Sequence, residues 1–242
     1  MKRFCALCLL VWALLFVFVF GADVAFAASL KGKVKSHVYH SPADNFTVPV
    51  PSGTFQKWMR AEDNFSSDGG PGHLPVGVVS FSDDTGGRIG IQYTRMPDET
   101  MAKLQAPDTR EAALKAWLHD GAMPFWYLRA FPQSHITHEA MGTFEGMPAL
   151  LAVVVIPEGS GMLVTATQKR MDSRRGLVIF PRGHFVYLLS TETITAFGLA
   201  GGGGGALSDT DETWQKFASG LTEFYKSIVF QETNNLHREI AK

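Results

Sequence analysis

Two histidine pairs are the first residues in this chain whose type and spacing could bind a metal ion. His37 and His40 stand three residues apart, as do His135 and His138. Both pairs fall in segments with β-strand composition, where side chains alternate between faces, so residues three apart point to opposite sides. Without thiolates, a zinc site would need further ligands from distant segments. We therefore expect surface histidines and predict no metal site.

Two glycine-containing segments could hold a phosphate or a nucleophile. A phosphate loop needs Gly-Lys-Ser/Thr before a helix, but the glycine run 201–205 is followed by Ala-Leu-Ser. Ser160 has one glycine on each side, whereas a nucleophile elbow reads Gly-x-Ser-x-Gly. We predict no catalytic residue and no cofactor. The alternative is an exported hydrolase that gathers Ser160, His184 and Asp172 from separated segments.

An aromatic segment directly after Pro124 is the best candidate for a binding surface. Residues 125–131 read Phe-Trp-Tyr-Leu-Arg-Ala-Phe. Because Trp, Tyr and Arg dominate binding hot spots, Trp126, Tyr127 and Arg129 form a possible partner-binding patch. That patch would suit a docking subunit of an envelope complex. The competing interpretation is a core segment that closes a helix onto the sheet.

The charged residues give few further indications of function. Lys169, Arg170, Arg174 and Arg175 form a second candidate patch, although such a run is ordinarily a solvated hairpin edge. The chain carries 22 basic and 23 acidic residues, a net charge of −1. No basic face dominates, which argues against nucleic acid or an anionic membrane surface as the main partner. We expect a monomer with an unidentified protein or small-molecule partner.

The N-terminus predicts export. A basic start at Lys2 and Arg3 precedes an uncharged apolar run over residues 4–22 and then Ala25-Phe26-Ala27, the pattern of a secretory signal peptide. We predict cleavage between Ala27 and Ala28 and a periplasmic or secreted product. The alternative is an uncleaved anchor, because the run approaches the roughly 20 residues that span a bilayer. We expect contact with a membrane only if this segment is retained as an anchor.

The predicted signal also contains both cysteines, Cys5 and Cys8. A mature chain without cysteine has no disulfide, thiol nucleophile or thiolate ligand. It must therefore be stabilised by its core, in a domain long enough to bury one. We expect a single domain over residues 28–230 and a polar tail over residues 231–242.

Hydrophobic patterning predicts an α+β domain, an antiparallel sheet of short strands with two packed helices. One helix begins at Asp108 and ends near Gly121, and the other begins at Asp209. Residues 63–75, rich in glycine, predict a loop. The predicted strands are residues 34–40, 46–50, 55–59, 76–82, 88–96, 134–141, 149–156, 176–180 and 185–191.

Three segments carry a family resemblance. Tyr39-x-Ser41-Pro42 with Asn-Phe-Thr-Val-Pro-Val-Pro-Ser-Gly over residues 45–53 resembles the entry strand of PsbP-like and DcrB-like domains. Residues 145–149 resemble their mid-domain strand start, and residues 217–230 resemble their closing helix. The resemblance implies a three-layer sandwich and a non-enzymatic accessory or binding role, and it transfers no functional residue. Our leading hypothesis is an exported, non-enzymatic accessory or binding protein of the cell envelope.

Overall fold

The computed structural model describes residues 30–53, 56–70, 73–83, 87–158, 163–164, 169–170, 172–194 and 211–231. The chain divides into Met1–Leu30 and Lys31–Lys242, and every element below belongs to the second unit. The predicted signal and its cleavage site, Ser160, the glycine run 201–205 and the tail from residue 232 lie outside the described residues.

A seven-stranded antiparallel sheet is the centre of the unit, with strand order β4-β5-β6-β12-β11-β8-β7. Alternating and continuous apolar runs build it, as the sequence predicts. Its strands are β4 (Arg60–Ser66), β5 (Val76–Ser82), β6 (Arg88–Arg95), β7 (His135–Phe144), β8 (Met147–Ile156), β11 (Ser173–Arg182) and β12 (Phe185–Ile194).

A smaller four-stranded sheet joins the two ends of the unit, with strand order β1-β2-β3-β13. Its strands are β1 (Lys33–Lys35), β2 (Val38–His40), β3 (Phe46–Pro49) and β13 (Val229–Phe230). β9 (Leu163–Val164) and β10 (Lys169–Arg170) form a separate antiparallel pair. The helices are α2 (Asp98–Gln105), α3 (Arg110–Ala116), its π-helical continuation η2 (Trp117–Leu128), and α4 (Asp211–Ser227). The α+β class with an antiparallel sheet is thus confirmed.

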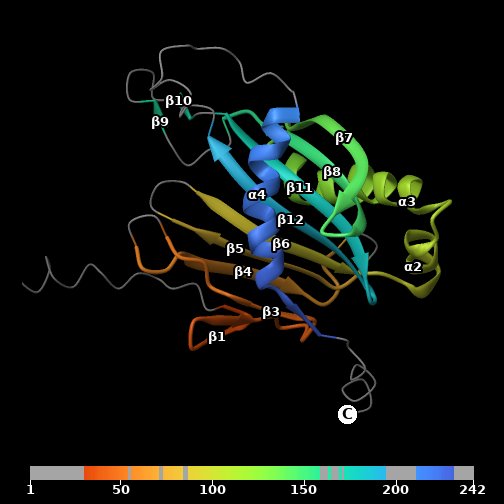
Figure 1. Cartoon of the computed structure of the whole chain (residues 1–242), viewed down its shortest axis with the longest axis horizontal. Helices are drawn as coiled ribbons and strands as arrows, with labels where there is room; N and C mark the ends of the chain where they lie inside the picture. Colours follow the sequence, from red (N-terminus) through yellow and green to blue (C-terminus); the bar gives the residue numbers. More distant parts are fainter. Residues whose placement is uncertain are drawn as a thin grey trace, which may run out of the picture. The chain divides into compact units, whose positions relative to one another are not determined.

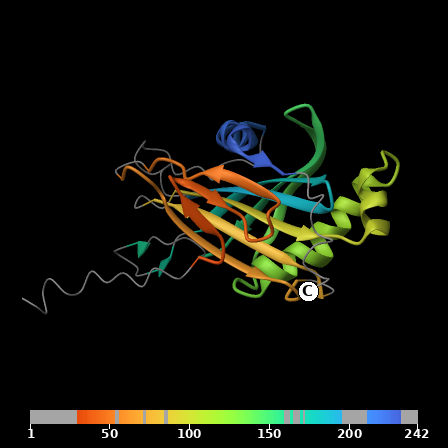
Figure 2. The same cartoon turned by 90° about the horizontal axis from the view of Figure 1, so that it is seen from below.

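Both faces of the large sheet are covered, and the two faces carry different cores. Figure 1 shows α4 lying across β11 and β12, with which it is in contact. Seen from below in Figure 2, α4 lies on one side of the sheet and α2, α3 and η2 lie on the other. The helix-covered core includes Leu114, Leu118 and Leu177, and the core on the α4 side includes Phe46, Tyr93 and Leu221.

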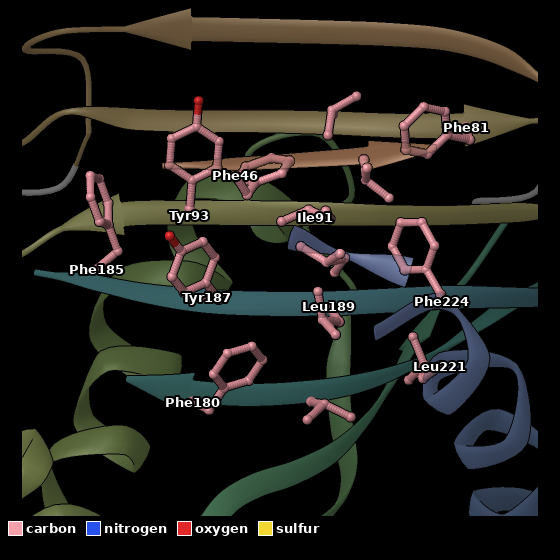
Figure 3. Close-up of a cluster of buried hydrophobic side chains, with 14 of the residues drawn as sticks. Phe46, Phe81, Ile91, Tyr93, Phe180, Phe185, Tyr187, Leu189, Leu221 and Phe224 are labelled. Carbon is pink, nitrogen blue, oxygen red and sulfur yellow. The ribbon is translucent and has the colours of Figure 1, made fainter. Parts of the chain in front are cut away.

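The core on the α4 side is unusually aromatic (Figure 3). The ring of Phe46, from the small sheet, meets Tyr93 of β6 edge-on at 5.5 Å, and Phe180 stacks on Tyr187 at 5.6 Å. The buried hydroxyls have polar partners: Ser41 Oγ donates to Asn45 Oδ1 at 2.6 Å and lies 3.1 Å from the Tyr93 hydroxyl. Burial raises the pKa of Tyr93 and Tyr187 above the usual range, so both phenols stay neutral.

A single carboxylate fastens the first described residues to the sheet. Asp63 of β4 accepts hydrogen bonds from the backbone N–H groups of Lys31, at 2.8 Å, and Gly32, at 2.7 Å. It also accepts one from the buried hydroxyl of Tyr39, at 2.8 Å. A side chain at Gly32 would overlap the His40 carbonyl oxygen and the Tyr39 ring, so this close approach requires glycine.

The N-terminal segments differ from the sequence prediction in three places. Residues 34–40 are not one strand but the hairpin β1–β2, because Ser36 and His37 take left-handed φ values of 48° and 62° that reverse the chain. Residues 56–59 are not a strand, since residues 56–58 form bends. Residues 63–66 continue β4 instead of starting a loop, because they pair with residues 76–79 of β5.

The helices also differ from the prediction. α2 was not expected; it buries Met101 and Leu104 against the sheet. The helix expected to end near Gly121 continues to Leu128, because its π-helical turns accommodate Pro124 and bury Ala122, Met123 and Tyr127. No helix among the described residues is both long and apolar enough to cross a membrane.

Two glycines provide a matched test of how α4 packs on the sheet. A Cβ at Gly176 of β11 would overlap Cγ of Phe217, whereas a Cβ at the exposed Gly220 of α4 would meet nothing within 4 Å. We expect Gly176→Ala to lower the free energy of unfolding by about 1–3 kcal/mol through overpacking. Gly220→Ala should raise it by about 0.5–1 kcal/mol. Urea unfolding measures both; equal effects would contradict this packing.

Candidate functional site

An arginine–glutamate–arginine row crosses three neighbouring strands at one end of the helix-covered face. In the strand registers Arg88 of β6 pairs with Glu192 of β12, and Glu192 pairs with Arg175 of β11. Residues paired across antiparallel strands present their side chains on the same face. Arg175 Nη2 and Nε lie 3.1 Å and 3.2 Å from the same oxygen, Glu192 Oε2. The two side chains are only 13% and 8% exposed.

Arg88 is the open member of this row. Its Nη2 donates to Ser80 Oγ at 3.0 Å, and among the described residues this is the guanidinium's only hydrogen bond. The residue itself is exposed. Its guanidinium is nevertheless partly desolvated by the groups around it; this desolvation and then the like charge of Arg175 lower the pKa of Arg88, against the opposing effect of Glu192. Glu62 acts in the same direction as Glu192 but is half-exposed and paired with Arg60 at 3.2 Å.

Buried polar side chains extend the row along the same face. Gln92 and Thr94 follow Arg88 at even spacing on β6, so they point to its side of the sheet. Tyr127 comes from η2 with no exposed surface, its ring 5.6 Å from Cζ of Arg175. Gln92 Oε1 and the Tyr127 hydroxyl make no hydrogen bond of good geometry among the described residues, but Tyr127 lies close enough to Gln92 and Arg175 to interact with both. Thr94 Oγ1 also has no hydrogen-bond partner there, but Thr94 pairs with Val186, six residues along β6 from Arg88, and lies away from the row.

Small residues lie between these side chains. Ser80, Gly90 and Ser190 pair across β5, β6 and β12 on the same face, one step along from the Arg88–Glu192 pair. Leu177 continues this line into the helix-covered core. The sheet face therefore changes from apolar to polar within three strands. We call Arg88, Arg175, Glu192, Gln92 and Tyr127 the arginine face.

The predicted aromatic patch does not form one surface. Tyr127 is fully buried and belongs to the arginine face, so it is not available to a surface partner. Trp126 is half-buried and packs edge-on against Trp117, with ring centroids 5.7 Å apart. Arg129 is exposed. A partner-binding role for Trp126 and Arg129 stays a prediction.

The two histidine pairs do not follow the expectation that residues three apart in a strand point to opposite faces. His37 lies in the β1–β2 turn and stacks on Trp58 at 4.1 Å, so it is not in a strand. A bulge between Ile136 and His138 breaks the alternation of β7. His135 and His138 therefore pair with Val155 and Val153 on one face, and the expectation of opposite faces is wrong there. Among the described residues no three His, Cys, Asp or Glu side chains gather as a metal site.

The residues of the hydrolase alternative are far apart where they are described. Asp172 precedes β11 and His184 follows it, so the ten residues of the strand separate them by roughly 30 Å. His184 Nδ1 lies 3.2 Å from Asp98 Oδ1, and Asp172 accepts the backbone N–H of Glu158 at 2.9 Å. Asp172 and His184 cannot belong to one triad.

Sequence analysis found part of the arginine face and missed the rest. Arg175 belonged to the basic run over residues 169–175, but the alternation of β11 turns it inward beside Tyr127 while Arg174 points to the other face. The alternation of Arg88 and Gln92 with Ile89 and Ile91 was visible. It gave no sign of what the polar face would meet, because Glu192 is about one hundred residues away in the chain.

Sixteen solved protein chains are similar to this chain, among them the following two. The solution structure of cyanobacterial PsbP (CyanoP) from Synechocystis is 11% identical, with a TM-score of 0.37, and the match covers 80% of this chain and 91% of that one. A Bacteroides thetaiotaomicron protein is 12% identical, with a TM-score of 0.38, over 82% of this chain and 50% of that one. No protein-family model and no curated protein matches the chain. The sequence resemblance and the first match name the same family. Both likenesses concern the fold alone.

The Arg88–Glu192–Arg175 row predicts an asymmetry in stability. Removing the carboxylate leaves two guanidinium groups side by side, whereas removing Arg175 leaves Glu192 next to Arg88. We expect Glu192→Gln to lower the free energy of unfolding by about 3 kcal/mol, as for a broken buried pair, and Arg175→Gln to lower it less. Urea unfolding in low-salt chloride buffer measures both. The opposite order would show that Arg88 does not share the carboxylate.

Proposed function

We propose that this chain is an exported, non-enzymatic binding protein of the cell envelope whose ligand contacts the arginine face. The observation that carries the binding role is the Arg88–Glu192–Arg175 row, in which one carboxylate adjoins two guanidinium groups and Arg88 is exposed to solvent. A bound molecule could use the donors of Arg88 that Ser80 does not occupy. The export part is supported by the N-terminal basic start, apolar run and Ala25-x-Ala27.

The composition of the row favours binding over catalysis. Glu192 holds the Arg175 guanidinium in place beside Tyr127, which is an arrangement that orients a ligand through hydrogen bonds. The proposal requires no nucleophile and no proton transfer. Its ligand would lie where β6, β11 and β12 present small residues between larger polar ones.

Export is tested by the mass and location of the chain. Expressed in full in a bacterium with two membranes, the wild type should be recovered outside the cytoplasm with a mass that begins at Ala28. Ala27→Arg should block cleavage, because the peptidase needs a small residue at that position. A wild-type product that keeps Met1 and stays in the cytoplasm would refute export. An exported product that keeps Met1 would favour the anchor instead.

Binding at this face is tested by a substitution within the row of small residues. The mature chain, residues 28–242, is screened by thermal shift against charged and neutral small molecules. A ligand of the arginine face should raise the Tm of the wild type, and Ser190→Leu should abolish that rise because a branched side chain fills the row.

Thr191→Leu is the matched control, since its neighbouring side chain points to the other face of β12. It should leave the shift unchanged, and circular dichroism should show both variants folded. Shifts that survive Ser190→Leu, or a screen without any shift, would refute a ligand site at this face.

A further inference from the structure

We infer that the arginine face binds a small carboxylate, held between the guanidinium groups of Arg88 and Arg175. This inference rests on the proposed function and names the charge and chemical class of the ligand. It follows from the charge, the geometry and the polar side chains of the site.

The site holds one positive charge more than its own carboxylate neutralises. Arg88 and Arg175 both adjoin Glu192, the one carboxylate of the row. Glu62 is nearby but half-exposed and engaged with Arg60. Desolvated like charges repel strongly, and a bound anion removes that repulsion. A carboxylate carries the single negative charge that balances the row.

The two guanidinium groups play different parts. Arg175 is buried and spends two donors, Nε and Nη2, on one oxygen of Glu192, so its plane is fixed. Arg88 is exposed and donates to Ser80 alone among the described residues, so a ligand reaches it from solvent. A planar guanidinium with remaining donors matches the two oxygens of a carboxylate. The anion would thus enter at Arg88 and be oriented by Arg175.

Polar side chains beside Arg175 favour a ligand with a second polar end. The Tyr127 hydroxyl and the Gln92 side chain lie close to each other and to Arg175. Burial raises the pKa of Tyr127, so its hydroxyl stays protonated and can donate. Gln92 Oε1 accepts. A hydroxyl next to the ligand's carboxylate could bridge the two side chains.

The competing interpretation is an ion-pair ladder that only closes the end of the sheet. The two differ in what Glu192 does. In a ladder, Glu192→Gln removes an attraction and nothing replaces it. In an anion site, Glu192 competes with the ligand for Arg175, so Glu192→Gln should tighten binding.

The experiment uses the mature chain and titration calorimetry at constant ionic strength. The probes are acetate, lactate and succinate, their neutral amides, and inorganic phosphate. We expect the carboxylates to bind, lactate more tightly than acetate, and the amides not to bind. Arg88→Gln should weaken binding by about tenfold or more, as for loss of a charged hydrogen-bonding partner. Arg182→Gln removes an exposed arginine at the other end of β11 and should change nothing.

Glu192→Gln should change the carboxylate affinity in the opposite direction. Its carboxylate affinity should rise, by about tenfold where one competing charge is removed, and lactate should restore part of its lost Tm. Equal binding of amides, tighter binding of phosphate than of any carboxylate, no binding of any anion, or an Arg88→Gln variant that binds normally would each overturn the inference. So would a folded Glu192→Gln variant that binds more weakly. If a neutral ligand binds the wild type and Ser190→Leu abolishes that binding, the carboxylate inference is refuted while the proposed function stands.

Discussion

The large sheet is buried on both faces, and this constraint organises the rest of the molecule. Because side chains alternate along a strand, every central strand must supply two cores at once. In β12, Tyr187 and Leu189 serve the aromatic core on the α4 side while Val186 and Leu188 serve the core under the helices. No position on such a strand is free to be polar without cost. A polar stretch on one buried face therefore indicates a role other than core packing.

The aromatic core shows how polar atoms are tolerated when their partners are close. Its tyrosines reach Ser41 and Asn45, which lie between β2 and β3, and Asp63 of β4. These contacts also fasten the small sheet to the large one. The motif residues that carried the family resemblance thus have a structural task in this core. They are not part of the arginine face.

The arginine face is where the same constraint is relaxed. Along β12 the helix-facing positions run from Leu188 through Ser190 to Glu192, and the adjacent strand changes from Leu177 to Arg175. Burying this ion pair adds little stability by itself, since desolvation offsets most of the attraction. With Arg88 exposed at its end, the row fits the proposed binding site better than it fits a source of stability.

The sequence by itself determined the fold class, most strand positions and the amphipathic closing helix, since hydrophobic periodicity is a local property. It could not determine the β1–β2 turn, the extension of β4 or the bulge in β7, because these depend on pairing between strands. It also left the segment of Tyr127 open between a surface patch and a core segment, and the structure places Tyr127 in the core. The arginine face came only from tertiary structure: Arg88 and Glu192 are far apart in the chain, and strand register alone makes them neighbours.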